Sequence, residues 1–78
     1  MPHDFITHAK RIESALKLAG CPAIAERLKD ARLGGATSGE ILMGLRHECR
    51  TAQKDLEIPF EIRADMLALA HAVDETGI

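Results

Sequence analysis

The chain has 78 residues, a formal net charge of −2 at pH 7 and a hydrophobic fraction of 46%. A chain of this length forms one domain at most, and it buries only about 60% of the surface that its unfolded form exposes. Such a thin core leaves little room for a substrate pocket, which disfavours an enzyme. The slightly acidic balance disfavours a strongly basic nucleic-acid binder. We therefore predict a single domain over residues 1–78 that has no catalytic residue.

The apolar residues of this chain are mostly small. There is no Trp or Tyr, only two Phe are present, and alanine makes up much of the hydrophobic content. Alanine favours helices but buries little area on folding. Self-association would supply the missing burial, so we expect a homodimer or a complex with another protein.

The sequence shows no sign of export or of membrane insertion. Two cysteines do not make a disulfide framework, and no apolar run approaches the roughly 20 residues that span a bilayer. The first residues lack a basic stretch followed by an apolar one, as a secretory signal would have. We expect a protein of the reducing cytoplasm with no membrane partner.

Glycine and proline divide the chain into four segments of helical periodicity. The first segment runs from about Asp4, a preferred N-cap residue type, to Leu18, shortly before Gly20. Its apolar residues recur every three or four positions, at Phe5, Ala9, Ile12, Leu16 and Ala19. The second segment runs from about Pro22 to Arg32. It has a narrow apolar stripe and is expected to break within Leu33-Gly34-Gly35-Ala36.

The third segment begins with Thr37 and Glu40, whose spacing is typical of a capping box in which each side chain satisfies the other residue's backbone N–H. Its apolar stripe comprises Leu42, Leu45, Cys49, Ala52 and Leu56. The helix is expected to include Leu56 and to end before Pro59, because the residue before a proline avoids helical geometry.

The fourth segment runs from about Pro59 to Asp74, with a main stripe of Ile62, Met66, Leu69, Ala70 and Val73. No segment alternates with a period of two, so we predict no strand. Short connections between amphipathic helices favour antiparallel neighbours. The predicted fold is all-α, a compact bundle of four short amphipathic helices that is either complete in itself or completed by dimerisation. A longer, thinner arrangement completed by a second copy is the alternative.

The fourth segment has a second apolar stripe, formed by Phe60, Ala64, Leu67 and His71. It lies roughly opposite the main stripe, whereas a surface helix of a monomer usually needs only one. The helix is therefore either central in the bundle or in contact with a second chain. We predict that these four residues bind a partner, and that the protein is a non-catalytic interaction or regulatory module.

A basic arc lies on the third segment and comprises Arg46, His47, Arg50 and Lys54. It is either a surface for phosphates or an acidic partner, or a solvated face that pairs with neighbouring helices. The second and third segments also have part of a helix-turn-helix pattern, but Gly44 stands where an apolar core residue is wanted, and the arginines come late in the helix. A small DNA-binding regulator is therefore the alternative hypothesis.

Other chemistry is less well supported by the sequence. Cys21 precedes a helix start, where a thiolate is stabilised, but no resolving cysteine lies near it. An enzyme using Cys21 is the weakest hypothesis. His3 and His8 are five residues apart, which is not a same-face spacing, and a zinc site needs three or four converging ligands. We predict no metal and no cofactor.

Overall fold

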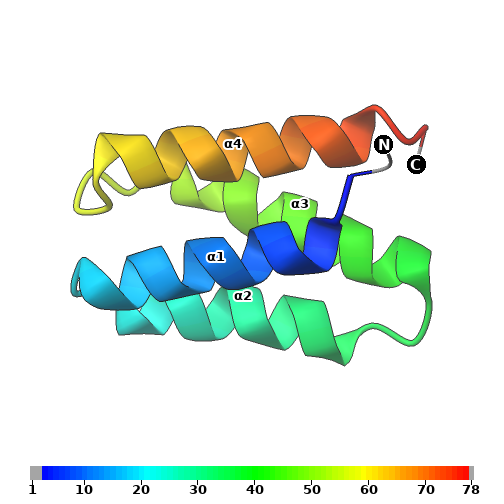
Figure 1. Ribbon diagram of the computed structural model, residues 1–78, viewed down its shortest axis with the longest axis horizontal. Coiled ribbons are helices and arrows are strands. Elements are labelled where there is room, and N and C mark those ends of the chain that lie inside the picture. The colour runs from blue at the N-terminus through cyan, green and yellow to red at the C-terminus, as the bar shows by residue number, and fades with distance from the viewer. Residues whose placement is uncertain (1–2, 78) are drawn as a thin grey trace.

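The computed structural model describes residues 3–77, which form four helices (Figure 1). They are α1 (Phe5–Leu18), α2 (Pro22–Gly34), α3 (Ser38–Ala52) and α4 (Phe60–Asp74). Residues 3–77 contain no strand, and the predicted compact all-α bundle is confirmed. Within this described range, no helix has both the length and the apolar character needed to cross a bilayer.

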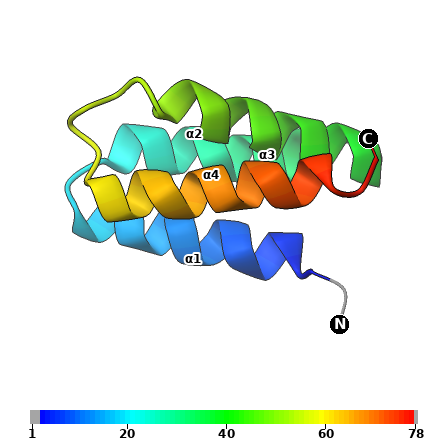
Figure 2. The same ribbon diagram turned by 90° about the horizontal axis from the view of Figure 1, so that it is seen from above.

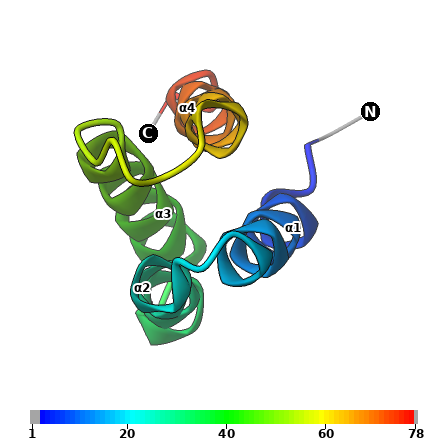
Figure 3. The same ribbon diagram turned by 90° about the vertical axis from the view of Figure 1, so that its left-hand side faces the viewer.

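The four helices form a ring in which each helix packs against two others. Successive helices run antiparallel along the long dimension of a molecule that measures 31 × 22 × 21 Å (Figures 1 and 2). In the end-on view the order around the ring is α1, α2, α3, α4, and α4 packs back against α1 (Figure 3). The helices α1 and α3 therefore face each other diagonally.

Local capping fixes both ends of α1 where the sequence predicts them. The Asp4 carboxylate accepts a hydrogen bond from the backbone N–H of Thr7 at 3.0 Å, which satisfies one of the free donors of the first turn. At the other end Gly20 has a φ of 81°, a conformation that costs a glycine little. The backbone N–H of Cys21 then donates to the Leu16 carbonyl at 2.8 Å and closes the helix.

The cap of α3 matches the prediction in one half and differs in the other. The Thr37 hydroxyl accepts from the backbone N–H of Glu40 at 3.2 Å, as predicted. The Glu40 carboxylate accepts from the backbone N–H of Ala36 at 3.0 Å, and not from that of Thr37. The side chain therefore ties down the connection before the cap and not the cap residue itself.

The core lies along the axis of the ring and is built from the predicted stripes. Each helix contributes residues that are almost completely buried, and the connection between α3 and α4 adds one more. They are Ala9, Ile12 and Leu16 from α1, Ala25 and Leu28 from α2, Leu45, Cys49 and Ala52 from α3, Ile58 from the connection, and Met66, Leu69, Ala70 and Val73 from α4. The helical period read from the sequence thus identifies the inward faces.

One predicted helix end is wrong. The helix α2 ends at Gly34, within the predicted break over residues 33–36, but α3 stops at Ala52 and does not reach Leu56. Leu56, predicted in the apolar stripe, is consequently 81% exposed, while Ile58 is fully buried. Ending α3 early lets the chain turn so that Ile58 enters the core. The apolar stripe of α3 alone cannot show that Ile58 is buried in place of Leu56, because contacts with the other helices decide which of the two enters the core.

Glycine permits two close approaches around the α2–α3 connection. A Cβ at Gly44 would lie 3.4 Å from the Ala31 Cβ, so the small pair lets α2 and α3 pack closely. A Cβ at Gly35 would lie only 2.7 Å from the backbone nitrogen and from Cγ1 of Ile41. Gly44 therefore stands in a tight helix contact, and Gly35 is required where the chain folds back onto α3.

We predict that Gly35→Ala destabilises the fold by about 1–3 kcal/mol, the usual cost of forcing an extra methyl group into a packed site. Gly34→Ala is the matched control, because a Cβ there meets nothing within 4 Å. The control should be neutral or stabilise by up to about 1 kcal/mol, since alanine favours a helix more than glycine does. Thermal unfolding followed by circular dichroism measures both. Equal Tm values for the two variants would contradict the packing at Ile41.

We also predict that the two thiols differ in reactivity. Burial raises the pKa of the Cys49 thiol to about 12, so at neutral pH almost no thiolate forms there. Cys21 is only half-buried, and both cysteines are free. Labelling of the native protein with a thiol reagent should modify Cys21 first, and Cys49 only when the fold opens. Rapid labelling of both would be inconsistent with the position of Cys49 in the core.

Candidate functional site

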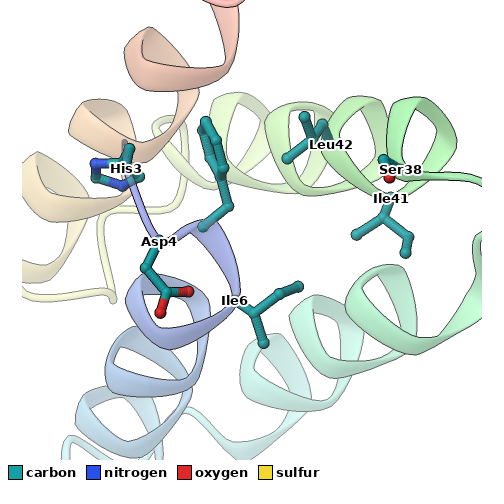
Figure 4. Close-up of a pocket in the computed structure, with 7 residues that line it drawn as sticks. His3, Asp4, Ile6, Ser38, Ile41 and Leu42 are labelled. Atoms are coloured by element: carbon teal, nitrogen blue, oxygen red, sulfur yellow. The ribbon is translucent and has the colours of Figure 1, made fainter. Parts of the chain in front are cut away.

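A hollow of about 570 Å³ lies between the first turns of α1 and α3 (Figure 4). Its lining comprises His3, Asp4, Phe5 and Ile6 on one side and Ser38, Ile41 and Leu42 on the other. The helices α1 and α3 are diagonal in the ring, so the hollow lies between two helices that are not neighbours around it. We call this the end hollow.

The walls of the end hollow are mostly apolar. Phe5, Ile41 and Leu42 are half-buried, and Ile6 is exposed at the edge. The volume falls within the range of about 300–1,000 Å³ that is common for small-molecule sites, which are typically apolar with a few polar groups. The polar groups here are His3, Asp4 and Ser38.

A chain of hydrogen bonds connects the end hollow to α4. Nε2 of His3 lies 2.8 Å from Nδ1 of His8, and Nε2 of His8 lies 2.7 Å from a carboxylate oxygen of Asp65. The His8 side chain is only 7% exposed. Arg11 donates to the same Asp65 oxygen at 3.3 Å, so this carboxylate has two partners from α1.

The meeting of His3 with His8 corrects a sequence prediction. A spacing of five on one helix would separate the two rings, but His3 lies before α1 and not on it. Asp4 has extended backbone angles, and the chain there turns so that the His3 ring packs against both Phe5 and His8. The helical spacing rule does not apply to a residue outside the helix.

For two neutral imidazoles, the contacts with Asp65 and between the rings assign a donor or acceptor role to each nitrogen. A carboxylate only accepts, so Nε2 of His8 donates to Asp65 and Nδ1 of His8 is left as an acceptor. His3 must then donate from Nε2, which leaves its own Nδ1 without a proton. In this neutral form Nδ1 of His3 is an acceptor, and Asp65 orients the His3 ring through His8.

Asp4 adds negative charge at the edge of the end hollow. The backbone N–H of Thr7, and then its hydroxyl, donate to the Asp4 carboxylate and hold its pKa below the ordinary value. The group is therefore ionised at neutral pH. The hollow thus has apolar walls and a charged rim.

The four residues of the predicted basic arc do not form one continuous surface on α3. Nε of Arg46 donates to Asp74 at 2.6 Å and a terminal nitrogen of Arg50 donates to the same carboxylate at 2.7 Å. His47 is exposed on α3, whereas Lys54 lies beyond the end of the helix in the connection to α4. The prediction that all four share one helical strip is wrong for Lys54, because α3 ends early.

The second stripe of α4 faces outward. Phe60 is 73% exposed, Ala64 and His71 are exposed, and Leu67 is half-buried. The Arg63 guanidinium lies 5.9 Å from the centre of the Phe60 ring. The helix is therefore not the centre of the bundle, and its outward stripe is in contact with no other part of residues 3–77 that would bury Phe60.

Sequence reasoning missed a buried ion pair between α1 and α2. The Arg32 guanidinium donates to both carboxylate oxygens of Glu13, at 2.8 and 3.1 Å, and both side chains are nearly buried. The hydrogen bond with Glu13 raises the pKa of Arg32. The two residues are 19 positions apart on polar flanks, so no periodic pattern marks them.

Among the described residues, neither the Cys21 thiol nor any group of metal-ligand residues forms an assembled site. Cys21 occupies the N-cap position of α2, and its sulfur lies 4.0 Å from the carbonyl oxygen of Ala19. Within residues 3–77, no three His, Cys, Asp or Glu side chains converge as a metal site would require.

Comparison of this chain with protein-family models, with curated proteins and with solved structures found no match.

We predict that replacing both Arg46 and Arg50 by alanine leaves the fold nearly intact at pH 7, lowering Tm by only a few degrees, because the side chains are solvent-exposed or partly so. The arginines lower the pKa of Asp74, chiefly through the hydrogen bond from Arg46. Their stabilising effect is therefore complete above the unfolded-state pKa near 3.8 and is lost as the pH falls below it. The Tm difference between parent and variant should shrink over that range. A difference that grows in acid would exclude the ion pairs.

Proposed function

We propose that this chain is a small, non-catalytic interaction module that self-associates through the outward stripe of α4. The observation behind the proposal is the exposure of Phe60, which is 73% accessible on a helix whose opposite face already fills the core. Leu56, in the connection before α4, is also 81% exposed. Large exposed apolar side chains that form a contiguous patch commonly mark a protein contact.

The spacing of the outward stripe favours a second copy as the partner. Phe60, Ala64, Leu67 and His71 are separated by four, three and four positions, the spacing of a helix–helix seam, and this order is the same in both directions. If two α4 helices pair antiparallel about a two-fold axis, Phe60 of one copy meets His71 of the other, and Ala64 meets Leu67. Each contact then joins a small residue to a large one, or an aromatic ring to an imidazole.

The size of the chain provides a second argument. A bundle of 78 residues with much alanine in its core gains little from burial. A two-fold contact uses one surface twice and so adds the most buried area for the fewest residues.

The free cysteines support a reducing compartment, and we propose a cytoplasmic location on that basis.

The alternative function, a DNA-binding regulator that acts through α3, has less support. Arg46 and Arg50 are both paired with Asp74, whose single negative charge offsets one of their two positive charges and ties both side chains to α4. A salt titration separates the two functions, since phosphate contacts weaken steeply with salt and apolar contacts do not. Duplex DNA that binds the parent, but not the variant lacking Arg46 and Arg50, would favour the regulator.

We predict that Leu67→Glu converts a dimer to a monomer, because it places an unpaired carboxylate in the seam once per copy. Leu67 is half-buried, so the same change can also disturb the fold. Ala64→Arg is the second test, because Ala64 is exposed and a long charged side chain there blocks the seam without touching the core. Molecular mass by light scattering over a concentration series measures both.

Leu33→Glu is the matched control, because Leu33 is exposed on a different helix. It should leave the mass unchanged. A parent that remains monomeric at high concentration would exclude the proposal. So would an Ala64→Arg variant that still dimerises with full helicity.

A further inference from the structure

We propose that the end hollow binds a small amphiphilic amine, that is, a protonated amino group attached to an apolar chain. This inference concerns a surface apart from the outward stripe of α4 and does not depend on self-association. It rests on the size of the hollow, on its apolar walls and on the kind of polar groups at its rim (Figure 4).

The dimensions of the end hollow favour a small ligand over a docked helix. The wall from α3 is the single turn from Ser38 to Leu42, and the opposite wall is residues 3–6. Five helical residues extend only about 7 Å, so a long helix would contact the hollow with little of its length. The walls also offer no strand edge with which an extended peptide could pair.

The charged group at the rim is a carboxylate, and the Ser38 hydroxyl can both donate and accept. Asp4 has an ionised carboxylate, and carboxylate oxygens can accept further hydrogen bonds beyond the two from Thr7. When both imidazoles are neutral, Nδ1 of His3 is an acceptor as well, because His8 then donates to Asp65 and accepts from His3. None of the seven lining residues is a lysine or an arginine. A head group that donates hydrogen bonds and has a positive charge fits this set.

The first turn of α3 has an opposing electrostatic effect, but a smaller one. A helix N-terminus corresponds to about half a positive charge and attracts anions. Thr37 and Glu40 already occupy donors there, and the carboxylates of Glu40 and Asp4 each bring a full negative charge to this end of the molecule. The net charge at the rim of the end hollow is therefore negative, which favours a positively charged ligand.

Three probes of equal chain length test the head-group preference: n-octylamine, n-octanol and n-octanoate. Each is titrated at pH 7 into the full chain while the methyl signals of Ile6, Ile41 and Leu42 are followed by NMR, with Leu18 at the far end as the internal control. We expect saturable shifts at the three lining residues and binding of the amine about five- to tenfold tighter than that of the carboxylate, because the exposed charge of Asp4 attracts one head group and repels the other.

Asp4→Asn is the matched variant, because asparagine is as good an N-cap as aspartate and α1 should remain intact. The variant should reduce the amine-to-carboxylate ratio to about twofold or less while leaving octanol binding unchanged. Ala64→Arg should leave amine binding unchanged even though it blocks the α4 seam. The experiment therefore tests the amine site separately from self-association.

Several results would overturn the assignment. Equal affinity for all three probes would remove the preference for a cation. Shifts that never saturate, or that appear equally at Leu18, would show that the hollow is not a site. Shifts at Ile6, Ile41 and Leu42 that depend on protein concentration without any probe would show that a second copy occupies the hollow.

Discussion

A core made largely of alanine and leucine holds four helices together only if the helices approach closely, and the rest of the structure depends on this constraint. The α2–α3 interface meets it with Gly44 against Ala31. The other three interfaces each have a charged contact as well as apolar packing. Between α1 and α2, Glu13 pairs with Arg32. Between α1 and α4, His8 and Arg11 contact Asp65. Between α3 and α4, Arg46 and Arg50 contact Asp74. Apolar packing is non-directional, and these contacts define the register between neighbouring helices.

The sequence was sufficient to predict the helices, because their signals are local. The stripe of α1 and its Asp4 cap, and the main stripe of α4, agree with the structure almost residue by residue. The end of α3 was not predictable from its own stripe. Leu56 continues the spacing of three and four, and only the burial of Ile58 from the following connection shows that the helix has already ended.

Of the two candidate sites, one could be predicted from a local pattern and the other depends on tertiary contacts. The outward stripe of α4 is a property of one helix and was visible as a pattern, and its exposure agrees with that pattern. The end hollow is a property of two diagonal helices. His8 and Asp65 are 57 residues apart in the chain, and His3 lies outside any helix, so no spacing relates the three. Residues that only the closed ring brings together cannot be found by periodicity.

The order of contacts around the ring also has a consequence for how the molecule opens. Three of the four interfaces join helices that are consecutive in the chain, and only the one between α1 and α4 closes a long loop. Closing a long loop costs more chain entropy than forming a helical hairpin. The α1–α4 interface is therefore the place where the ring should form last and separate first. The His3–His8–Asp65 chain spans that interface, so the arrangement of the end hollow depends on its closure.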